Sequence, residues 1–177
     1  LNIGANDTFD LGASGYTFTL TGSGTGLSRP FINNNTLTAG SSSTFKFTGT
    51  TDSDIQNATY DNLTLAPSGG SNPTYALMTG TIATDSFIIG DGSNAVTIDW
   101  NTNDPTLNVA GDFTLSASVT WTKSTTATLN LRPRGTKTWT DSNSTKQDVG
   151  AVSVANGSVT PTINLGSSVS ATSLTID

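Results

Sequence analysis

Apolar and polar residues alternate with a period of two along most of this chain. The alternation is clearest in residues 16–20, 44–48, 63–65, 96–100, 107–109, 113–115, 127–132 and 174–176. Within 44–48, Phe45 and Phe47 fall on one face and Lys46 falls on the other. Because successive side chains of a β-strand point to opposite faces, this pattern predicts strands with one apolar face and one face rich in hydroxyl groups.

Turn-forming residues separate the predicted strands. Gly, Ser, Asn, Asp and Pro gather at 22–24, 68–73, 91–94 and 156–157. These residue types accept a positive φ or close a turn through their own side chains. The predicted strands follow one another at intervals of about 8 to 12 residues, which suits a sandwich, a barrel or a solenoid.

Two kinds of internal repetition favour a solenoid. Leu1–Gly4 resembles Phe87–Gly90, and Ser173–Ile176 resembles Ser86–Ile89, so the sequence repeats with an offset of about 86 residues. A shorter phrase of strand, glycine and strand recurs inside each half, as in Leu107–Leu115. Such phrases look like successive faces of a coil.

We therefore expect an all-β chain folded as a right-handed parallel β-solenoid. Residues 1–86 are the first predicted repeat unit, and residues 87–177 are a second unit continuous with it. In such a fold Leu, Val, Ile and Phe stack inward from coil to coil, while Thr, Ser and Asn face solvent. Two tandem β-sandwich domains are the alternative, since a repeat of this length suits them too.

Three phrases of the sequence resemble a known family. They are Ser43–Thr50, Ala58–Leu65 and Leu107–Leu115. They resemble the repeats of large bacterial cell-surface and adhesin-like proteins, which are similar to right-handed parallel β-helices. The resemblance implies an elongated structural role and an extracellular position at the cell surface. Residues 119–147 depart from the repeat pattern, with five cationic residues and two Trp, and we expect an inserted hairpin or a contact patch there.

The composition removes most of the usual catalytic side chains. All 13 acidic residues are Asp, and the chain has no Glu, His or Cys. The lack of His excludes Ser-His-Asp triads, imidazole proton shuttles and His-ligated zinc, and the lack of Cys excludes disulfides and thiolate metal sites. We therefore expect no enzyme activity, no cofactor and no bound metal.

The charge and hydropathy of the chain argue against binding to nucleic acid and against a membrane-spanning helix. The net charge is −6 and the isoelectric point is about 4.2, so clustered phosphate contacts with nucleic acid are not expected. No apolar run approaches the ~20 residues of a membrane-spanning helix, and no signal-peptide pattern opens the sequence. Because the sequence opens in the middle of a strand pattern at Leu1–Ile3, we expect it to be part of a longer or processed chain.

Two Trp are candidates for a glycan or partner contact. Exposed aromatic rings stack on sugars through their apolar faces, and this predicts a glycan contact if Trp121 and Trp139 are exposed. Cationic residues lie close to them in sequence, and we group both rings with Lys137 and Arg134 as a candidate ligand-binding set. Packing in the core is the competing interpretation of both rings.

Other candidate chemistry has less support. Asp52, Asp54 and Asp91 lack the spacing of calcium-binding loops, so we interpret them as solvated turn residues. A pair of acidic residues brought together from neighbouring coils remains an alternative, as a site that cleaves polysaccharides. A Lys–Asn crosslink requires a buried Lys, whereas the alternation turns Lys46 outward. The Thr row at 136–140 is of the kind that ice-binding solenoids repeat, but a single row is expected by chance in so Thr-rich a chain.

Six Asn-x-Ser/Thr sequons are candidates for glycosylation, which would place them at exposed turns of a secreted protein. They lie at Asn6, Asn34, Asn57, Asn62, Asn143 and Asn156. In a bacterial protein we expect most of them to be bare.

These observations predict a structural module of an extracellular surface or filament-forming protein. It would act as a rigid stalk that assembles end to end with copies of itself or with adjoining repeats. A glycan-binding adhesin module is the first alternative, and a polysaccharide-degrading enzyme on the same fold is the second.

Overall fold

The chain folds into a parallel β-solenoid of about seven turns. The computed structural model describes residues 1–155 and 161–177, and every strand pair in this part of the chain is parallel. Apart from one short 3₁₀ helix, η1 (Gly26–Ser28), the described residues form no helix. The predicted all-β solenoid is confirmed, and tandem β-sandwiches are excluded because they are built from antiparallel sheets.

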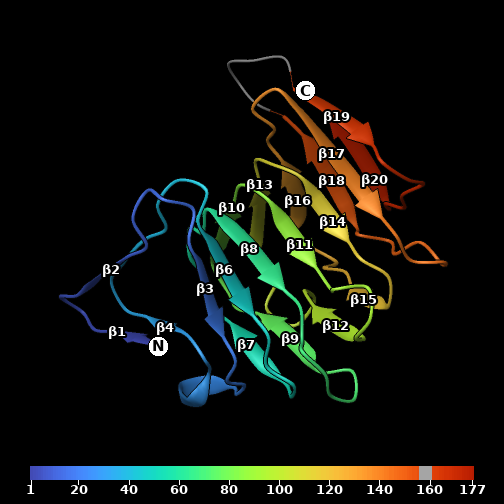
Figure 1. Ribbon diagram of the computed structural model, residues 1–177. Coiled ribbons are helices and arrows are strands. Elements are labelled where there is room, and N and C mark those ends of the chain that lie inside the picture. Colours follow the sequence, from blue (N-terminus) through green and yellow to red (C-terminus); the bar gives the residue numbers. More distant parts are fainter. Residues whose placement is uncertain (156–160) are drawn as a thin grey trace.

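Three long sheets run along the solenoid, and two small sheets lie near its N-terminal end (Figure 1). The seven-stranded sheet contains β3 (Thr17–Leu20), β6 (Thr44–Phe47), β8 (Asn62–Leu65), β11 (Phe87–Ile89), β14 (Phe113–Leu115), β17 (Thr136–Asp141) and β19 (Thr162–Leu165). The five-stranded sheet contains β10 (Thr81–Thr84), β13 (Thr106–Val109), β16 (Thr128–Leu131), β18 (Ala151–Val154) and β20 (Ser173–Ile176). The four-stranded sheet contains β7 (Ser53–Ile55), β9 (Thr74–Leu77), β12 (Val96–Asp99) and β15 (Val119–Thr122). The small sheets pair β1 (Asn2–Ile3) with β4 (Ile32–Asn33) and β2 (Thr8–Asp10) with β5 (Thr36–Thr38).

The chain visits the three long sheets in turn. Strands β11, β12 and β13 belong to the seven-, four- and five-stranded sheets, and β14, β15 and β16 repeat that order. Figure 1 shows the strands of each sheet stacked in chain order, from blue at the N-terminal end to red at the C-terminal end. The coils differ in length. The segment from Thr44 to its partner Asn62 in the next coil is much shorter than the segment from Asn2 to its partner Ile32.

Inward side chains form columns along the axis of the solenoid. In the seven-stranded sheet, strand register places one such column at Phe18, Phe45, Leu63, Phe87, Phe113, Trp139 and Leu165. Ring centroids within it lie 6.0 Å apart for Phe87 and Phe113 and 6.1 Å apart for Phe113 and Trp139. Full burial of one such side chain stabilises a fold by about 1.5–3 kcal/mol, so the columns supply the main driving force for stacking the coils.

The predicted inward faces are buried in the middle of the stack. Leu107, Val109, Phe113 and Leu115 are at most 1% exposed. The turn predicted at 68–73 is present as well, and Gly70 there has a φ of +94°. A Cβ at Gly70 would lie 2.2 Å from the Thr50 carbonyl oxygen, so both the backbone angle and the close approach require glycine. The turn predicted at 156–157 lies outside the described residues.

At the C-terminal end of the stack, the expected inward burial is not found. Leu174 and Ile176 of β20 are 56% and 71% exposed, and Leu165 of β19 is 61% exposed. These strands are the last of their sheets, so no further coil covers their inward side chains. Tyr16, just before the edge strand β3 at the other end, is 61% exposed for the same reason. Sequence alternation predicts a face of a strand but not the neighbour that buries it.

The shortest structural repeat is a single coil. Phe87–Ile89 lies in the seven-stranded sheet, whereas Ser173–Ile176, which it resembles in sequence, lies in the five-stranded sheet. The division into units 1–86 and 87–177 stays a prediction.

A truncation in the central column tests the importance of the stack. We expect Phe113→Ala to lower the free energy of unfolding by about 3–5 kcal/mol, because it removes a fully buried ring between two neighbouring coils. Thr114→Ala, on the outward face of the same strand, should change the free energy of unfolding by less than about 1 kcal/mol. Urea unfolding followed by circular dichroism measures both values, and equal losses for the two variants would contradict the inward column.

Candidate functional site

A polar groove runs along one corner of the solenoid, where the chain leaves the five-stranded sheet for the seven-stranded sheet. Its volume is about 740 Å³. The connections that enter β8, β11, β14 and β17 line it, and so does the turn before β6. Most lining residues are Ser, Thr, Asn or charged, and the charged ones are Asp61, Asp85, Arg132 and Arg134.

Asp61 and Asp85 stack on neighbouring coils at this corner. The Asp85 N–H donates to the Asp61 carbonyl, and the Gly111 N–H donates to the Asp85 carbonyl at 2.6 Å, so backbone bonds hold three successive connections in line. Partial burial and the negative charge of Asp85 raise the pKa of the Asp61 carboxyl group. Backbone N–H groups of Ser42 and Ser43 lower that pKa but do not offset the rise. The fold therefore holds two like charges close together at one end of the groove.

Arg132 and Arg134 lie at the same corner, two coils further along the stack. Both side chains are exposed, and the Arg132 N–H donates to the Val109 carbonyl at 2.7 Å. Within residues 1–155 and 161–177 neither guanidinium group makes a hydrogen bond or an ion pair. Arg29, by contrast, donates to the side chain of Gln56 at 2.8 Å. The groove thus has two unpaired cations at one end and an acidic pair at the other.

An amide ladder borders the space between these charges. Asn108 of β13 pairs in register with Asn130 of β16, and the Asn130 Nδ2 donates to the Asn108 Oδ1 at 3.1 Å. Because the two residues face outward from the five-stranded sheet, they leave amide donors and acceptors beside the groove.

The structure does not bring together the four residues that the sequence suggested as a ligand-binding set. Arg134 lines the groove, and Lys137 follows it closely in sequence, partly buried at the start of β17. Trp121 and Trp139 are 6% and 3% exposed and belong to the hydrophobic core. Neither indole therefore presents a ring face on which a sugar could stack. A ligand role for Arg134 and Lys137 stays a prediction.

The three indole N–H groups differ in their hydrogen bonding. The Trp100 Nε1 donates to the Pro105 carbonyl at 2.7 Å. The Nε1 atoms of Trp121 and Trp139 are buried and have no partner. A buried donor without a partner costs about 1–3 kcal/mol, so these two residues contribute through ring burial despite the polar atom.

Residues 119–147, which depart from the repeat pattern, contain a compact loop at 141–147 where the four-stranded sheet ends. The Asn143 Oδ1 accepts the Val119 N–H, and the Gln147 Oε1 accepts the Trp121 N–H, each at 3.0 Å. These side chains replace the backbone acceptors of a further strand. Asp141, 1% exposed, organises the loop because its carboxylate accepts the N–H of Asn143 at 2.9 Å and that of Gln147 at 2.7 Å. The departure from the repeat is therefore a side-chain cap on a sheet edge.

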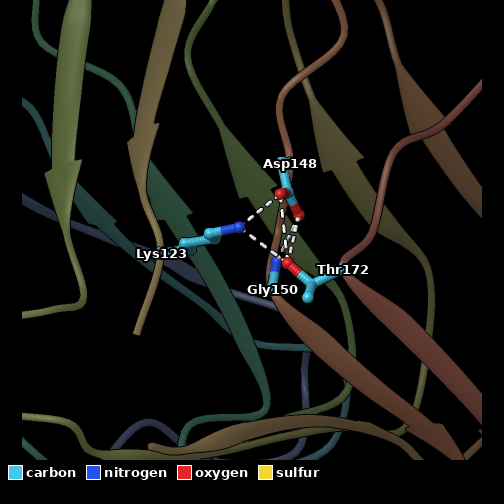
Figure 2. Close-up of polar contacts among 4 residues, drawn as sticks. All are labelled: Lys123, Asp148, Gly150 and Thr172. Atoms are coloured by element: carbon cyan, nitrogen blue, oxygen red, sulfur yellow. Dashed lines mark hydrogen bonds and ion pairs between the residues drawn. The ribbon is translucent and has the colours of Figure 1, made fainter. Parts of the chain in front are cut away.

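A second polar cluster joins three coils at another corner (Figure 2). Lys123 Nζ contacts the Asp148 carboxylate and donates to the Thr172 hydroxyl at 2.6 Å, and the Gly150 N–H donates to Asp148 at 2.9 Å. Partial burial would raise the pKa of Asp148, but the bonds from Lys123, Gly150 and Thr172 outweigh it and hold this pKa below its ordinary value. Since the Lys123 and Asp148 side chains are 37% and 40% exposed, we interpret the cluster as a solvated contact between coils that contributes at most about 1 kcal/mol.

The other acidic candidates accept backbone N–H groups, but only Asp91 does so within its own turn. Asp54 lies within β7, so its interpretation as a turn residue is wrong, and Asp52 and Asp54 accept their hydrogen bonds from other coils. Asp52 accepts the Thr74 N–H at 2.8 Å, and Asp54 accepts the Gly26 N–H at 2.6 Å. Asp91 accepts the N–H groups of Asn94 and Ser93, and these bonds lower its pKa. In the described parts of the chain, no three acidic side chains come together as a potential metal site.

The sequons are not all exposed. Asn6 and Asn34, the sequons nearest the N-terminus, are exposed, whereas Asn57 and Asn62 are partly buried. Asn143 is 6% exposed, and its Nδ2 donates to Asp141, so the expected exposed turn at this sequon is wrong. Asn156 lies outside the described residues.

Sequence reasoning missed three charged residues of the groove, Asp61, Asp85 and Arg132. Each Asp stands two positions before the first inward residue of a strand, Leu63 for Asp61 and Phe87 for Asp85, and strand register pairs Leu63 with Phe87. This recurrence was visible in the sequence, but the strand register was needed to show that the residues stack.

Comparisons with known proteins give no relative: no protein-family model matches the chain, and no curated protein and no solved structure matches it either. The resemblance to adhesin-like repeats therefore stays a prediction, whereas the parallel solenoid is observed. Within residues 1–155 and 161–177 no helix has the length and apolar character needed to cross a membrane.

Two Trp substitutions test the difference in indole hydrogen bonding. We expect Trp100→Phe to lower the free energy of unfolding more than Trp139→Phe, by about 1 kcal/mol, because only Trp100 loses a satisfied hydrogen bond and leaves the Pro105 carbonyl unpaired. Urea unfolding of both variants measures the difference. A larger loss for Trp139→Phe would show that its Nε1 has a partner.

Asp61→Asn tests the strain within the acidic pair. A raised pKa in the folded state means that the charged form of Asp61 opposes folding, so the penalty is absent at low pH and grows as the pH rises through the folded pKa. We expect the variant to be more stable than the parent protein at pH 7, by less than about 1 kcal/mol. The gain should disappear below the ordinary pKa of 3.8. Thermal unfolding between pH 3 and pH 7 measures it, and a loss of stability at pH 7 would contradict the charge repulsion.

Proposed function

We propose that this chain is a structural module of an extracellular surface or filament-forming protein, a non-enzymatic rigid stalk that assembles end to end. The observation that carries the proposal is the uncovered last coil. Leu165 continues the column of Phe113 and Trp139 by strand register, and Ile176 continues the column of Val154. These side chains have the inward position of core residues, yet they are exposed.

The rest of the solenoid supports a stalk. Each coil is joined to the next by parallel strand pairing in two or three sheets, and its inward side chains pack against those of the neighbouring coils. A stack of this kind has no hinge between coils, because bending it would separate side chains that bury one another.

The two ends of the seven-stranded sheet suit one another. Its first strand, β3, has the sequence Thr-Phe-Thr-Leu, and its last strand, β19, has the sequence Thr-Ile-Asn-Leu. Pairing of β3 from one copy with β19 of another, in the register of the inward column, would set Phe18 against Leu165. Such a contact joins different surfaces of the two copies, so it repeats without closing and produces a linear assembly.

A charge at the exposed end of the column should block this assembly. We expect the 177-residue protein to form concentration-dependent linear assemblies, and we expect Leu165→Asp to abolish them, since an aspartate cannot enter an apolar column. Sedimentation velocity over a hundredfold range of concentration measures the effect.

Ile88→Asp is the matched control. Ile88 is 40% exposed on the outward face of β11, in the middle of the stack, so the same charge there should leave assembly unchanged. A parent protein that stays monomeric at every concentration, or equal effects of the two substitutions, would overturn the proposed end-to-end contact.

A further inference from the structure

We propose that the corner groove binds an extended acidic oligosaccharide, with Arg132 and Arg134 holding a sugar carboxylate and Asp61 and Asp85 accepting hydrogen bonds from neutral sugar hydroxyls. This inference is independent of end-to-end assembly, since the groove lies along the side of the stack.

The unpaired charges point to a ligand. Two guanidinium groups lie at one end of the groove without a partner in the described part of the chain, and two carboxylates repel one another at the other end. Guanidinium groups bind carboxylates through paired N–H···O bonds, and carboxylates accept hydrogen bonds from hydroxyl groups. A ligand with an anionic group at one end and hydroxyl groups at the other would satisfy both ends.

The length of the groove favours an oligomer. The connection that carries Asp61 and the one that carries Arg132 are three coil steps apart, about 14 Å at a parallel strand spacing of about 4.8 Å. The amide ladder of Asn108 and Asn130 lies alongside, and it offers further donors and acceptors between the two charged ends. A single small metabolite would not reach from one charged end to the other.

The lining favours a sugar over a peptide. Apart from Ala83, Ala110 and Tyr60, which is 2% exposed, the groove is lined by polar side chains, so an apolar peptide side chain would find no pocket. A peptide also cannot add as a strand at this corner, because the backbone groups of Asp61, Asp85 and Gly111 already bond between coils. A ligand rich in hydroxyl groups requires neither a pocket nor a free edge.

The experiment is a titration of the full chain with acidic hexasaccharides from polygalacturonate, alginate and hyaluronate, with cellohexaose and maltohexaose as neutral probes. Isothermal titration calorimetry measures each Kd. We expect at least one acidic hexasaccharide to bind at least tenfold more tightly than the neutral ones. Arg132→Gln and Arg134→Gln should each weaken that binding about tenfold, or about 1.4 kcal/mol. Asp85→Asn should weaken it as well, although it makes the protein less negative.

Lys46→Gln is the matched control, because it removes one positive charge from the outward face of β6, away from the groove. It should leave the Kd unchanged, and circular dichroism should show that all the variants remain folded. Equal weakening by Lys46→Gln and by the Arg variants would indicate general electrostatic attraction and would overturn the site. The absence of binding by every acidic hexasaccharide at millimolar concentration would overturn the proposed ligand class, and tighter binding by Asp85→Asn would overturn the role of the acidic pair.

Discussion

Each coil of this protein relies on its neighbours to bury the side chains that point to the axis. A short strand such as β8 or β14 contributes only two inward side chains, too few to form a core alone. In register, those side chains become the continuous columns in which Leu63, Phe87 and Phe113 are almost completely buried. The stability of one coil is therefore inseparable from the coils on either side of it, and the same dependence leaves the last coil with exposed apolar groups.

The same register decides which polar groups meet. Because parallel strands hold neighbouring coils about 4.8 Å apart, residues at one corner position stack whether or not their charges agree. At one corner this produces the favourable contact of Lys123 with Asp148, and at another it produces the repulsion between Asp61 and Asp85. The stacking force of the core is large compared with the electrostatic terms at the surface, so the fold tolerates an unfavourable pair. Candidate binding chemistry thus arises as a consequence of the column register.

Alternation along the sequence predicted an all-β chain and the inward faces of the central strands, and internal repetition was needed to favour a solenoid over a sandwich or a barrel. Alternation could not predict the burial of a face at the end of a stack, as Leu174 shows, because burial requires a neighbour that the local pattern does not describe. It also could not predict the groove, since coils of unequal length give no fixed spacing by which to align Asp61 with Asp85. The assignment of Asn143 to an exposed turn failed because the loop after β17 buries this side chain against the edge of β15, where it accepts the Val119 N–H.

The cap at the end of the four-stranded sheet limits how the stack can continue. Strand register places Asp141 above Leu115, so a carboxylate occupies a position that an apolar side chain holds in the coils below. A buried carboxylate is tolerated only when hydrogen bonds replace its water, and the N–H groups of the 141–147 loop supply them. The loop in turn covers the edge of β15 with the amides of Asn143 and Gln147. Of the three long sheets in the described part of the chain, only the seven- and five-stranded ones therefore keep an uncovered edge strand at this end, and any coil that is added there must pair through those two sheets.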